Sequence, residues 1–371
     1  SDVCSSDLEW GLWESADFVQ CGVRIRQSVD RNGRWGAIRV DMAHYAEELE
    51  AVPIPPMRRK RPDLPLTKAE VAEFRGLCGQ LMWLAVQAVP PIMAPLSLLL
   101  GFSANPTVDT LLRANRLLRE AKVEARIPLV MHSLKNPCVL AWTDAAWAVR
   151  RDGSSQGGHL VALADGDALL NREFRTNVIT WHSGKLPRVA RSSSAAEVQA
   201  ACAGQEELEY VRLVVYEVLH GAFPLKQWEA SCRSIPGALV MDCRGVYDAL
   251  QSESSALGMS DRRSALEALG LKRALRSTAT TLRWTHSGAQ LADCLTKDTV
   301  QSKASWQLLC RRNFSWKLVY DPLFLSEKKR KQTGLNALDL FPQGEQSEDH
   351  ALESDFLDTK NTNILRLQMS R

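Results

Sequence analysis

The chain has 371 residues, enough for about two domains, and 45% of them are hydrophobic, as in an ordinary globular protein. The net charge of only +3 is too small to indicate nucleic-acid binding by itself. The nine cysteines include no Cys-x-x-Cys pair, which argues against a zinc site or a disulfide framework and favours reduced cysteines in an intracellular protein.

The first 65 residues contain only short predicted elements. Residues 1–8 match no helix or strand pattern, and residues 1–15 are left unassigned as a possible artefact. Strands are predicted at 18–24 and 35–40, followed by a helix at 43–51. The Pro-rich segment 54–65 has four consecutive basic residues, which either belong to a solvated linker or contact phosphate.

Residues 66–134 are expected to form a helical segment. A Thr-x-x-Glu capping box begins a helix that runs from 67 to about 89, and a second helix is predicted at 106–125. The apolar stretch 77–102 is long enough to raise the question of a membrane span. Its three prolines would break a spanning helix, so the sequence predicts no membrane segment.

The hydrophobic pattern changes after residue 137. The predicted elements are, in chain order, strands at 139–147, 158–163 and 177–181, a helix at 194–220, a strand at 238–241, helices at 246–251 and 264–275, a strand at 281–284 and a helix at 289–297. Strands that alternate with helices predict an α/β domain with a mixed five-stranded sheet flanked by helices. The first three strands are expected to form an antiparallel meander.

Two carboxylates are predicted on or beside the central strands. Asp144 shares a strand face with Leu140 and Trp142, where Asp is disfavoured. Its structural alternative is a turn at the end of the strand. Asp242 directly follows the apolar strand 238–241, at the edge where ligands of α/β proteins gather. Its alternative is the N-cap of the next helix.

Two further carboxylates lie on predicted helices. Glu197 falls on the apolar, core-facing stripe of the helix at 194–220, although Ser194 and Glu197 also fit a capping box. Asp293 lies on the last short helix, and a solvated helix face is its alternative. Four clustered carboxylates would repel one another and need neutralisation, which Mg²⁺ achieves with oxygen ligands. Two such ions about 4 Å apart favour phosphodiester cleavage.

The four carboxylates lie within short motifs. These are W-T-D-A-A-W at 142–147 with S-S-Q-G at 154–157, I-T-W-H-S-G-K at 179–185 with V-A-R-S-S-S-A-A-E at 189–197, M-D at 241–242, and Q-L-A-D-C-L-T-K at 290–297. They resemble the ribonuclease H domain of copia-type retrotransposon Pol polyproteins, in which the second block reads W-S-S-K-K-Q … S-S-T-E-A-E and the last reads Q-L-A-D-I-L-T-K. The resemblance implies a ribonuclease H-like sheet.

The resemblance continues upstream of this domain. V-Q-C-G at 19–22, Tyr45 and F-R-G-L-C-G-Q-L-M-W-L-A at 74–85 resemble the end of the copia-type reverse transcriptase and its connection. The implied divisions are a remnant of the C-terminal part of the reverse transcriptase at 16–65, a helical connection at 66–134 and a ribonuclease H-like domain at 135–320. No Asp-Asp dipeptide occurs in the sequence, so polymerase activity is not expected of this chain.

The resemblance implies a metal-dependent ribonuclease H that cuts the RNA strand of RNA–DNA hybrids. Two Mg²⁺ or Mn²⁺ ions would be held by four carboxylates, Asp144, Glu197, Asp242 and Asp293. Asp144 and Asp242 would be shared between the ions, Glu197 would also face the 2′-hydroxyl of the substrate, and Asp293 would complete the second site.

Four more residues are candidates for the reaction or for substrate binding. By analogy with a mobile histidine of cellular ribonuclease H enzymes, His286 is a candidate for product release, with a plain loop histidine as the alternative. Lys185, Arg188 and Ser193 are candidate nucleic-acid contacts. For the two basic side chains, a solvated surface is the alternative.

Three departures from the copia-type pattern motivate a second hypothesis. Ala195 replaces the family's first Glu, Cys243 replaces its Asn or Ser, and D-R-R-S at 261–264 replaces a Lys-His motif. An inactive or domesticated ribonuclease H-like module, which binds nucleic acid or packs against a polymerase, therefore stands as the alternative.

The last part of the sequence differs in composition from the rest. Residues 326–371 are polar and charged with few large apolar residues, which predicts a disordered tail. Its basic run at 328–331 is either a solvated charge cluster or a nuclear-import or nucleic-acid patch. The expected partners are an RNA–DNA hybrid and the reverse transcriptase part of the same polyprotein. The expected location is intracellular, in a cytoplasmic virus-like particle or the nucleus.

Overall fold

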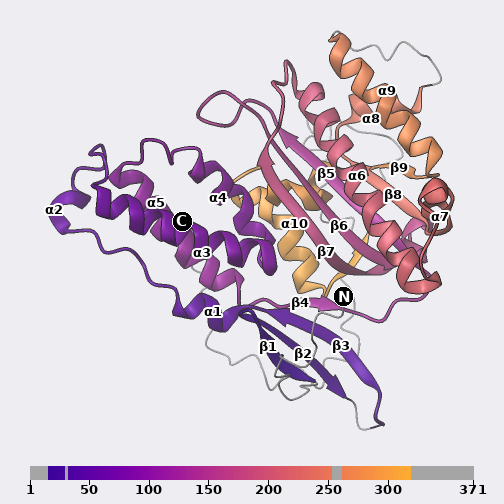
Figure 1. Ribbon diagram of the computed structural model, residues 1–371, viewed down its shortest axis with the longest axis horizontal. Coiled ribbons are helices and arrows are strands. Elements are labelled where there is room, and N and C mark those ends of the chain that lie inside the picture. The colour runs from indigo at the N-terminus through magenta and orange to yellow at the C-terminus, as the bar shows by residue number, and fades with distance from the viewer. Residues whose placement is uncertain (1–15, 30–31, 253–260, 319–371) are drawn as a thin grey trace, which may run out of the picture. The chain divides into compact units, whose positions relative to one another are not determined.

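The computed structural model describes residues 16–29, 32–252 and 261–318 (Figure 1). The predicted tail at 326–371 and the unassigned segment 1–15 lie outside the described residues. All described residues belong to one of the chain's two units, Ser1–Phe324.

Three strands at the start of the described chain and a fourth that follows α5 (Val108–Glu124) form an antiparallel sheet in the order β1-β2-β3-β4. Its strands are β1 (Asp17–Gln20), β2 (Val23–Val29), β3 (Trp35–Asp41) and β4 (Leu129–Met131). The single strand predicted at 18–24 is instead a tight hairpin. Cys21 and Gly22 at its turn have φ angles of 51° and 82°, the left-handed conformation that two-residue hairpin loops require.

The helices that follow are α1 (Ala43–Glu48), α2 (Pro56–Arg59), α3 (Lys68–Gln87), the 3-10 helix η2 (Pro90–Ile92), α4 (Met93–Leu100) and α5 (Val108–Glu124). The predicted capping box is present, because Thr67 and Glu70 each accept a hydrogen bond from the other's backbone N–H. The prolines at 90 and 91 divide the apolar stretch into two shorter helices. Among the described residues, no helix is both long enough and apolar enough to cross a membrane.

The basic run at 58–61 overlaps α2. Arg58 holds Glu70 in a two-pronged ion pair with both N···O distances at 2.7 Å, and Arg59 donates to the carbonyl of Ile54 at 3.0 Å. These two arginines therefore fasten the segment to its neighbours. Lys60 and Arg61 are exposed, and a phosphate contact of the run stays a prediction.

The second sheet has six strands in the order β10-β7-β6-β5-β8-β9. They are β5 (Pro137–Ala146), β6 (Gln156–Asp165), β7 (Glu173–Lys185), β8 (Gly237–Met241), β9 (Thr281–Trp284) and β10 (Ser315–Lys317). The antiparallel meander β5-β6-β7 and the parallel pairs β5-β8 and β8-β9 confirm the predicted mixed α/β sheet. The prediction lacked β10, a three-residue strand too short to show a period-two pattern.

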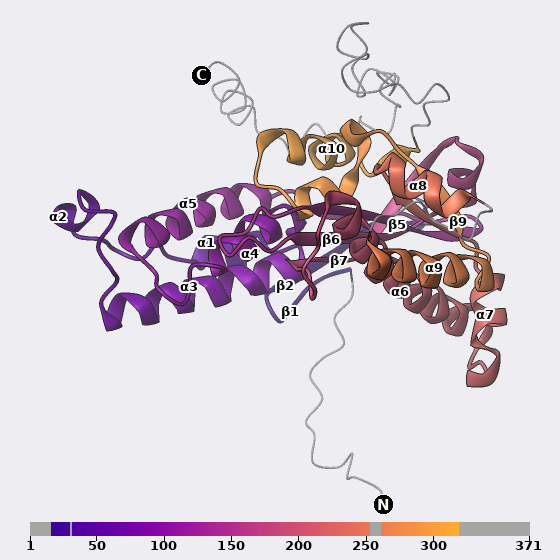
Figure 2. The same cartoon turned by 90° about the horizontal axis from the view of Figure 1, so that it is seen from above.

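Helices cover both faces of this sheet. They are α6 (Ser193–His220), α7 (Trp228–Ser234), α8 (Arg244–Gln251), α9 (Arg262–Ser277) and α10 (Val300–Arg311), with short 3-10 helices η3 (Gly166–Leu170), η4 (Leu225–Gln227), η5 (Ser287–Ala289) and η6 (Leu291–Leu295). Figure 2 shows α6 and α9 on one side of the sheet and α10 on the other. Buried side chains of β5 and β8, such as Val139 and Leu239, pack with those of α6 and α9, such as Leu208 and Ala268.

A glycine sets the separation between α6 and the central strand. Gly204 of α6 faces Thr143 of β5, and a Cβ added to Gly204 would lie only 2.2 Å from Thr143 Cγ2. Any larger residue would therefore push the helix outward. The close approach brings the first turns of α6 next to the end of β5, where the carboxylates lie.

Candidate metal centre

Asp144 is the most buried of the predicted carboxylates. It lies on β5 with 1% of its surface exposed, and the strand continues to Ala146, so the alternative of a strand-end turn is wrong. The hydroxyl of Thr296 donates to Asp144 Oδ2, and Lys297 Nζ lies 3.2 Å from the same oxygen. Two residues that follow η6 thus hold the carboxylate of the central strand.

The structural alternatives for Glu197 and Asp242 are also wrong. The N-cap of α6 is Ser192, whose hydroxyl accepts from Ala195 N at 3.1 Å, so Ser194 does not form a capping box with Glu197. The N-cap of α8 is Cys243, not Asp242. Neither carboxylate is therefore accounted for by capping a helix.

Three carboxylates converge from three separate elements. Asp144 comes from β5, Glu197 from the second turn of α6, and Asp242 from the end of β8. One carboxylate oxygen of each lies within 4.8 Å of the others. The structure thus brings together three of the four carboxylates that the sequence proposed as a metal site.

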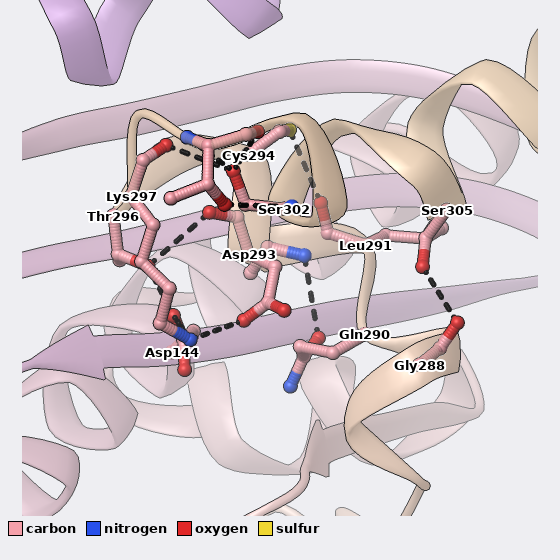
Figure 3. Close-up of polar contacts among 12 residues, drawn as sticks. Asp144, Gly288, Gln290, Leu291, Asp293, Cys294, Thr296, Lys297, Ser302 and Ser305 are labelled. Atoms are coloured by element: carbon pink, nitrogen blue, oxygen red, sulfur yellow. Dashed lines mark hydrogen bonds and ion pairs between the residues drawn. The ribbon is translucent and has the colours of Figure 1, made fainter. Parts of the chain in front are cut away.

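Asp293 lies next to this group but contacts a lysine. It belongs to the 3-10 helix η6, and its side chain is only 15% exposed, so it does not lie on a solvated helix face. Lys297 Nζ is 2.6 Å from Asp293 Oδ1. Figure 3 shows the ammonium group of Lys297 between Asp144 and Asp293. Within the described residues, the group of three carboxylates that share a point does not include Asp293.

The close packing of η6 on the sheet explains this arrangement. Gly158 of β6 faces Leu295, and a Cβ on Gly158 would lie 2.7 Å from Leu295 Cβ and 3.0 Å from the Leu295 carbonyl oxygen. The glycine lets η6 lie directly on the strand beside β5. Asp293, Thr296 and Lys297 are thereby brought to Asp144, about 150 residues earlier in the chain.

The electrostatics of the group indicate a shortage of positive charge. Burial, and then the charge of Asp144, raise the pKa of Glu197 well above its usual value, that of Asp242 to about 6 and that of Asp293 to about 8. Burial opposes the charge of Lys297, but its carboxylate neighbours outweigh this effect and raise its pKa. One ammonium group leaves the carboxylates only partly neutralised, so a further cation would stabilise them.

The donor set fits a hard divalent cation. The three converging ligands are all carboxylates, and the group includes no histidine or cysteine among the described residues. Mg²⁺ and Mn²⁺ prefer such oxygen ligands, whereas softer metals favour sulfur and imidazole. Asp144, Glu197 and Asp242 would hold such an ion.

The other predicted site residues lie apart from this group or are already paired. Lys185 Nζ is 2.6 Å from Asp152 Oδ2, and Arg188 is 2.8 Å from Glu267 Oε1. Both cations are therefore paired with carboxylates of the chain itself. Ser193, the first residue of α6, is exposed. The roles of these residues in nucleic-acid binding stay predictions.

His286 caps a short helix after β9. Its Nδ1 accepts a hydrogen bond from Gly288 N at 3.0 Å, and the residue is half-buried. This contact fixes one ring nitrogen as an acceptor in a loop that leads to η6. A part in product release stays a prediction.

Thr296 and Lys297, which both contact Asp144, are polar residues of this site that the sequence reasoning missed, and Lys297 is the charged one. It lies in the Q-L-A-D-C-L-T-K motif, four residues after Asp293. The signal was the spacing of an acidic and a basic residue by one helical turn, which places the two side chains together. That spacing gave no sign of the second contact, to Asp144.

No protein-family model and no curated protein matches this chain. Solved structures that match include an RNase H1 from the halophilic archaeon Halobacterium salinarum, with 18% identity over 46% of this chain and 98% of that chain and a TM-score of 0.25. The N-terminal RNase H domain of a Mycobacterium tuberculosis protein, solved as a maltose-binding-protein fusion, has 16% identity over 47% of this chain and 96% of that chain, with a TM-score of 0.26. A foamy viral protease–reverse transcriptase in complex with an RNA/DNA hybrid has 12% identity over 46% of this chain and 20% of that chain, with a TM-score of 0.28. None of these is described as a copia-type protein, and that assignment stays a prediction.

Proposed function

We propose that the domain at 135–320 is a metal-dependent ribonuclease H that cuts the RNA strand of RNA–DNA hybrids, within a copia-type Pol polyprotein. The observation that carries this proposal is the convergence of Asp144, Glu197 and Asp242 within 4.8 Å of one another at the ends of β5, α6 and β8. Three buried or half-buried carboxylates at one point are costly unless a cation neutralises them.

A Mg²⁺ or Mn²⁺ ion bound here would activate water and stabilise the leaving oxygen of a phosphodiester. Hydrogen bonds within the chain position the carboxylates that would bind this ion. The Thr296 hydroxyl orients the carboxylate of Asp144, and Trp284 Nε1 donates to the carbonyl oxygen of Asp242 at 3.0 Å. The close contact of Gly204 with β5 keeps α6, and with it Glu197, near the strand.

The proposed substrate would be recognised by shape and backbone. Hybrids of RNA and DNA take up an A-like form, so contacts to phosphates and 2′-hydroxyls are expected in place of base-edge readout. Lys185 and Arg188 are the proposed phosphate contacts. Because each is paired with a carboxylate, binding would require them to exchange Asp152 and Glu267 for phosphate oxygens.

The helices upstream of the domain contact it directly. Trp181 Nε1 of β7 donates to the carbonyl of Ala85 in α3 at 2.9 Å, and Arg150 donates to the Ser97 hydroxyl of α4 at 3.0 Å. These contacts support the proposal that residues 66–134 connect the nuclease to a reverse transcriptase part in a longer polyprotein.

The test is cleavage of an RNA–DNA hybrid, labelled on the RNA strand, with Mg²⁺ or Mn²⁺. The wild-type chain should cut it, and Asp144→Asn should lower the rate at least roughly 100-fold, because several kcal/mol of charge stabilisation is lost. Asp167→Asn is the matched control, because Asp167 is exposed and its side chain pairs with Arg172, away from the three carboxylates.

Equal cleavage by the wild type and Asp144→Asn would refute the proposal. Salt-dependent hybrid binding without cleavage and without Mn²⁺ binding would identify the inactive binding module.

A further inference from the structure

Lys297 forms ion pairs with two carboxylates of the acidic site. Its Nζ lies 2.6 Å from Asp293 Oδ1 and 3.2 Å from Asp144 Oδ2 (Figure 3). Its backbone is held on both sides, because Lys297 N donates to the carbonyl of Asp293 at 3.2 Å and Ser302 Oγ donates to the carbonyl of Lys297 at 3.0 Å. These bonds hold the backbone of Lys297 beside the two carboxylates that its ammonium group contacts.

The same two carboxylates are those that a second divalent ion would need. The resemblance implies that such an ion would be shared by Asp144 and completed by Asp293. An ion bonded to both would lie within about 2–3 Å of their oxygens, in the space that the ammonium nitrogen fills. The two cations would repel each other strongly at such a separation in a half-buried site. Lys297 and a second ion therefore compete for one position.

We propose that Lys297 takes the place of the second divalent cation, so that the chain binds a single ion, at Asp144, Glu197 and Asp242. This inference rests on the proposed function, since it concerns the ion content of that same site. The ammonium group neutralises Asp144 and Asp293. It has three N–H donors, of which two are directed at these carboxylates, so the third is left for a substrate phosphate oxygen.

The stoichiometry of Mn²⁺ binding to the full chain tests the inference, with free Mn²⁺ followed by electron paramagnetic resonance. The wild type should bind one ion, and Lys297→Gln should bind two, because the variant opens the position between Asp144 and Asp293. Lys303→Gln is the matched control. Lys303 also bridges two carboxylates, Glu120 and Asp298, and its loss should leave the stoichiometry at one.

A second variant keeps the test decisive if Lys297→Gln does not fold. Asp293→Asn should still bind one ion, as the wild type does, whereas a two-ion site would lose one of its ions. Two ions bound to the wild type, or one ion bound to both the wild type and Lys297→Gln, would overturn the inference and leave the proposed nuclease intact. A wild-type chain that binds no Mn²⁺ would overturn both.

Discussion

Gly204 of α6 lies so close to Thr143 of β5 that a Cβ on the glycine would be 2.2 Å from the threonine methyl group. Glu197 lies two helical turns before Gly204 on the same face of α6, and Asp144 follows Thr143 on β5. The close approach of the Gly204 backbone to the Thr143 side chain therefore controls how near Glu197 comes to Asp144. It links the packing of the helix to the geometry of the candidate metal site.

Gly204→Ala should both destabilise the chain and weaken metal binding. The added methyl group must push α6 away from β5, at a cost of about 1–3 kcal/mol in the free energy of unfolding. Glu197 would move with the helix, so the affinity for Mn²⁺ should fall. Urea unfolding and Mn²⁺ titration measure the two effects.

Gly270→Ala is the control for this prediction. Gly270 lies within α9, and a Cβ there would meet no atom within 4 Å. The change should therefore raise stability by up to about 1 kcal/mol through helix propensity, with no effect on Mn²⁺ affinity. A Gly204→Ala chain as stable as Gly270→Ala would show that the helix does not depend on the contact.

Glu197→Gln should separate stability from metal binding. Burial and the charges of Asp144 and Asp242 raise the pKa of Glu197, so the ionised carboxylate destabilises the folded state relative to the unfolded state. Removal of the charge should raise the melting temperature of the metal-free chain. It should also lower Mn²⁺ affinity at least roughly tenfold, because a lost ligand charge is worth several kcal/mol.

Glu206→Gln, an exposed position on the same helix, controls for the loss of a glutamate charge. Neither melting temperature nor Mn²⁺ affinity should change by more than the error of the measurement. If Glu197→Gln behaves in the same way as Glu206→Gln, then Glu197 is not a ligand.

His159 should make the chain less stable in mild acid. Burial, and then the nearby His182, lower the pKa of His159 to about 4, and the two rings stack at 5.5 Å. Since the unfolded histidine has a pKa near 6.5, the unfolded state takes up the proton first as the pH falls. The stabilisation is therefore complete above about pH 6.5 and is lost between about 6.5 and 4, to a total of about 3 kcal/mol.

The measurement compares the wild type with His159→Gln by urea unfolding at several pH values. The raised pKa values of Glu197, Asp242 and Asp293 act in the opposite sense, because their folded forms bind protons more readily. These carboxylates are present in both chains, so the difference between the two curves isolates His159. A difference that does not change with pH would contradict the prediction.

Much of the sheet and its main helix could be predicted because the hydrophobic residues of the long elements recur with the period of a strand or a helix. The meander β5-β6-β7, the long helix α6 and the parallel strands β8 and β9 were all expected from the sequence. The three-residue strands β4 and β10 were not, because their partners lie far away in the chain and a short strand shows no alternation. The helix predicted at 289–297 is instead a pair of 3-10 helices, η5 and η6.

The candidate site was only partly predictable for a similar reason. The positions of Asp144 on a strand and of Asp242 at a strand end follow from the hydrophobic pattern, whereas their convergence depends on the pairing of β5 with β8, which the pattern does not give. The position of Lys297 against Asp144 depends on how closely η6 lies on Gly158, a contact between distant parts of the chain. The ion pairs of Lys185 and Arg188 with Asp152 and Glu267 also join residues without any local pattern.

Anomalous diffraction from crystals of the full chain grown with Mn²⁺ tests the central claim most directly. The account predicts an anomalous peak bonded to oxygens of Asp144, Glu197 and Asp242, with the ammonium group of Lys297 still between Asp144 and Asp293. Crystals that contain ordered Mn²⁺ elsewhere, with no anomalous density beside these three carboxylates, would contradict it.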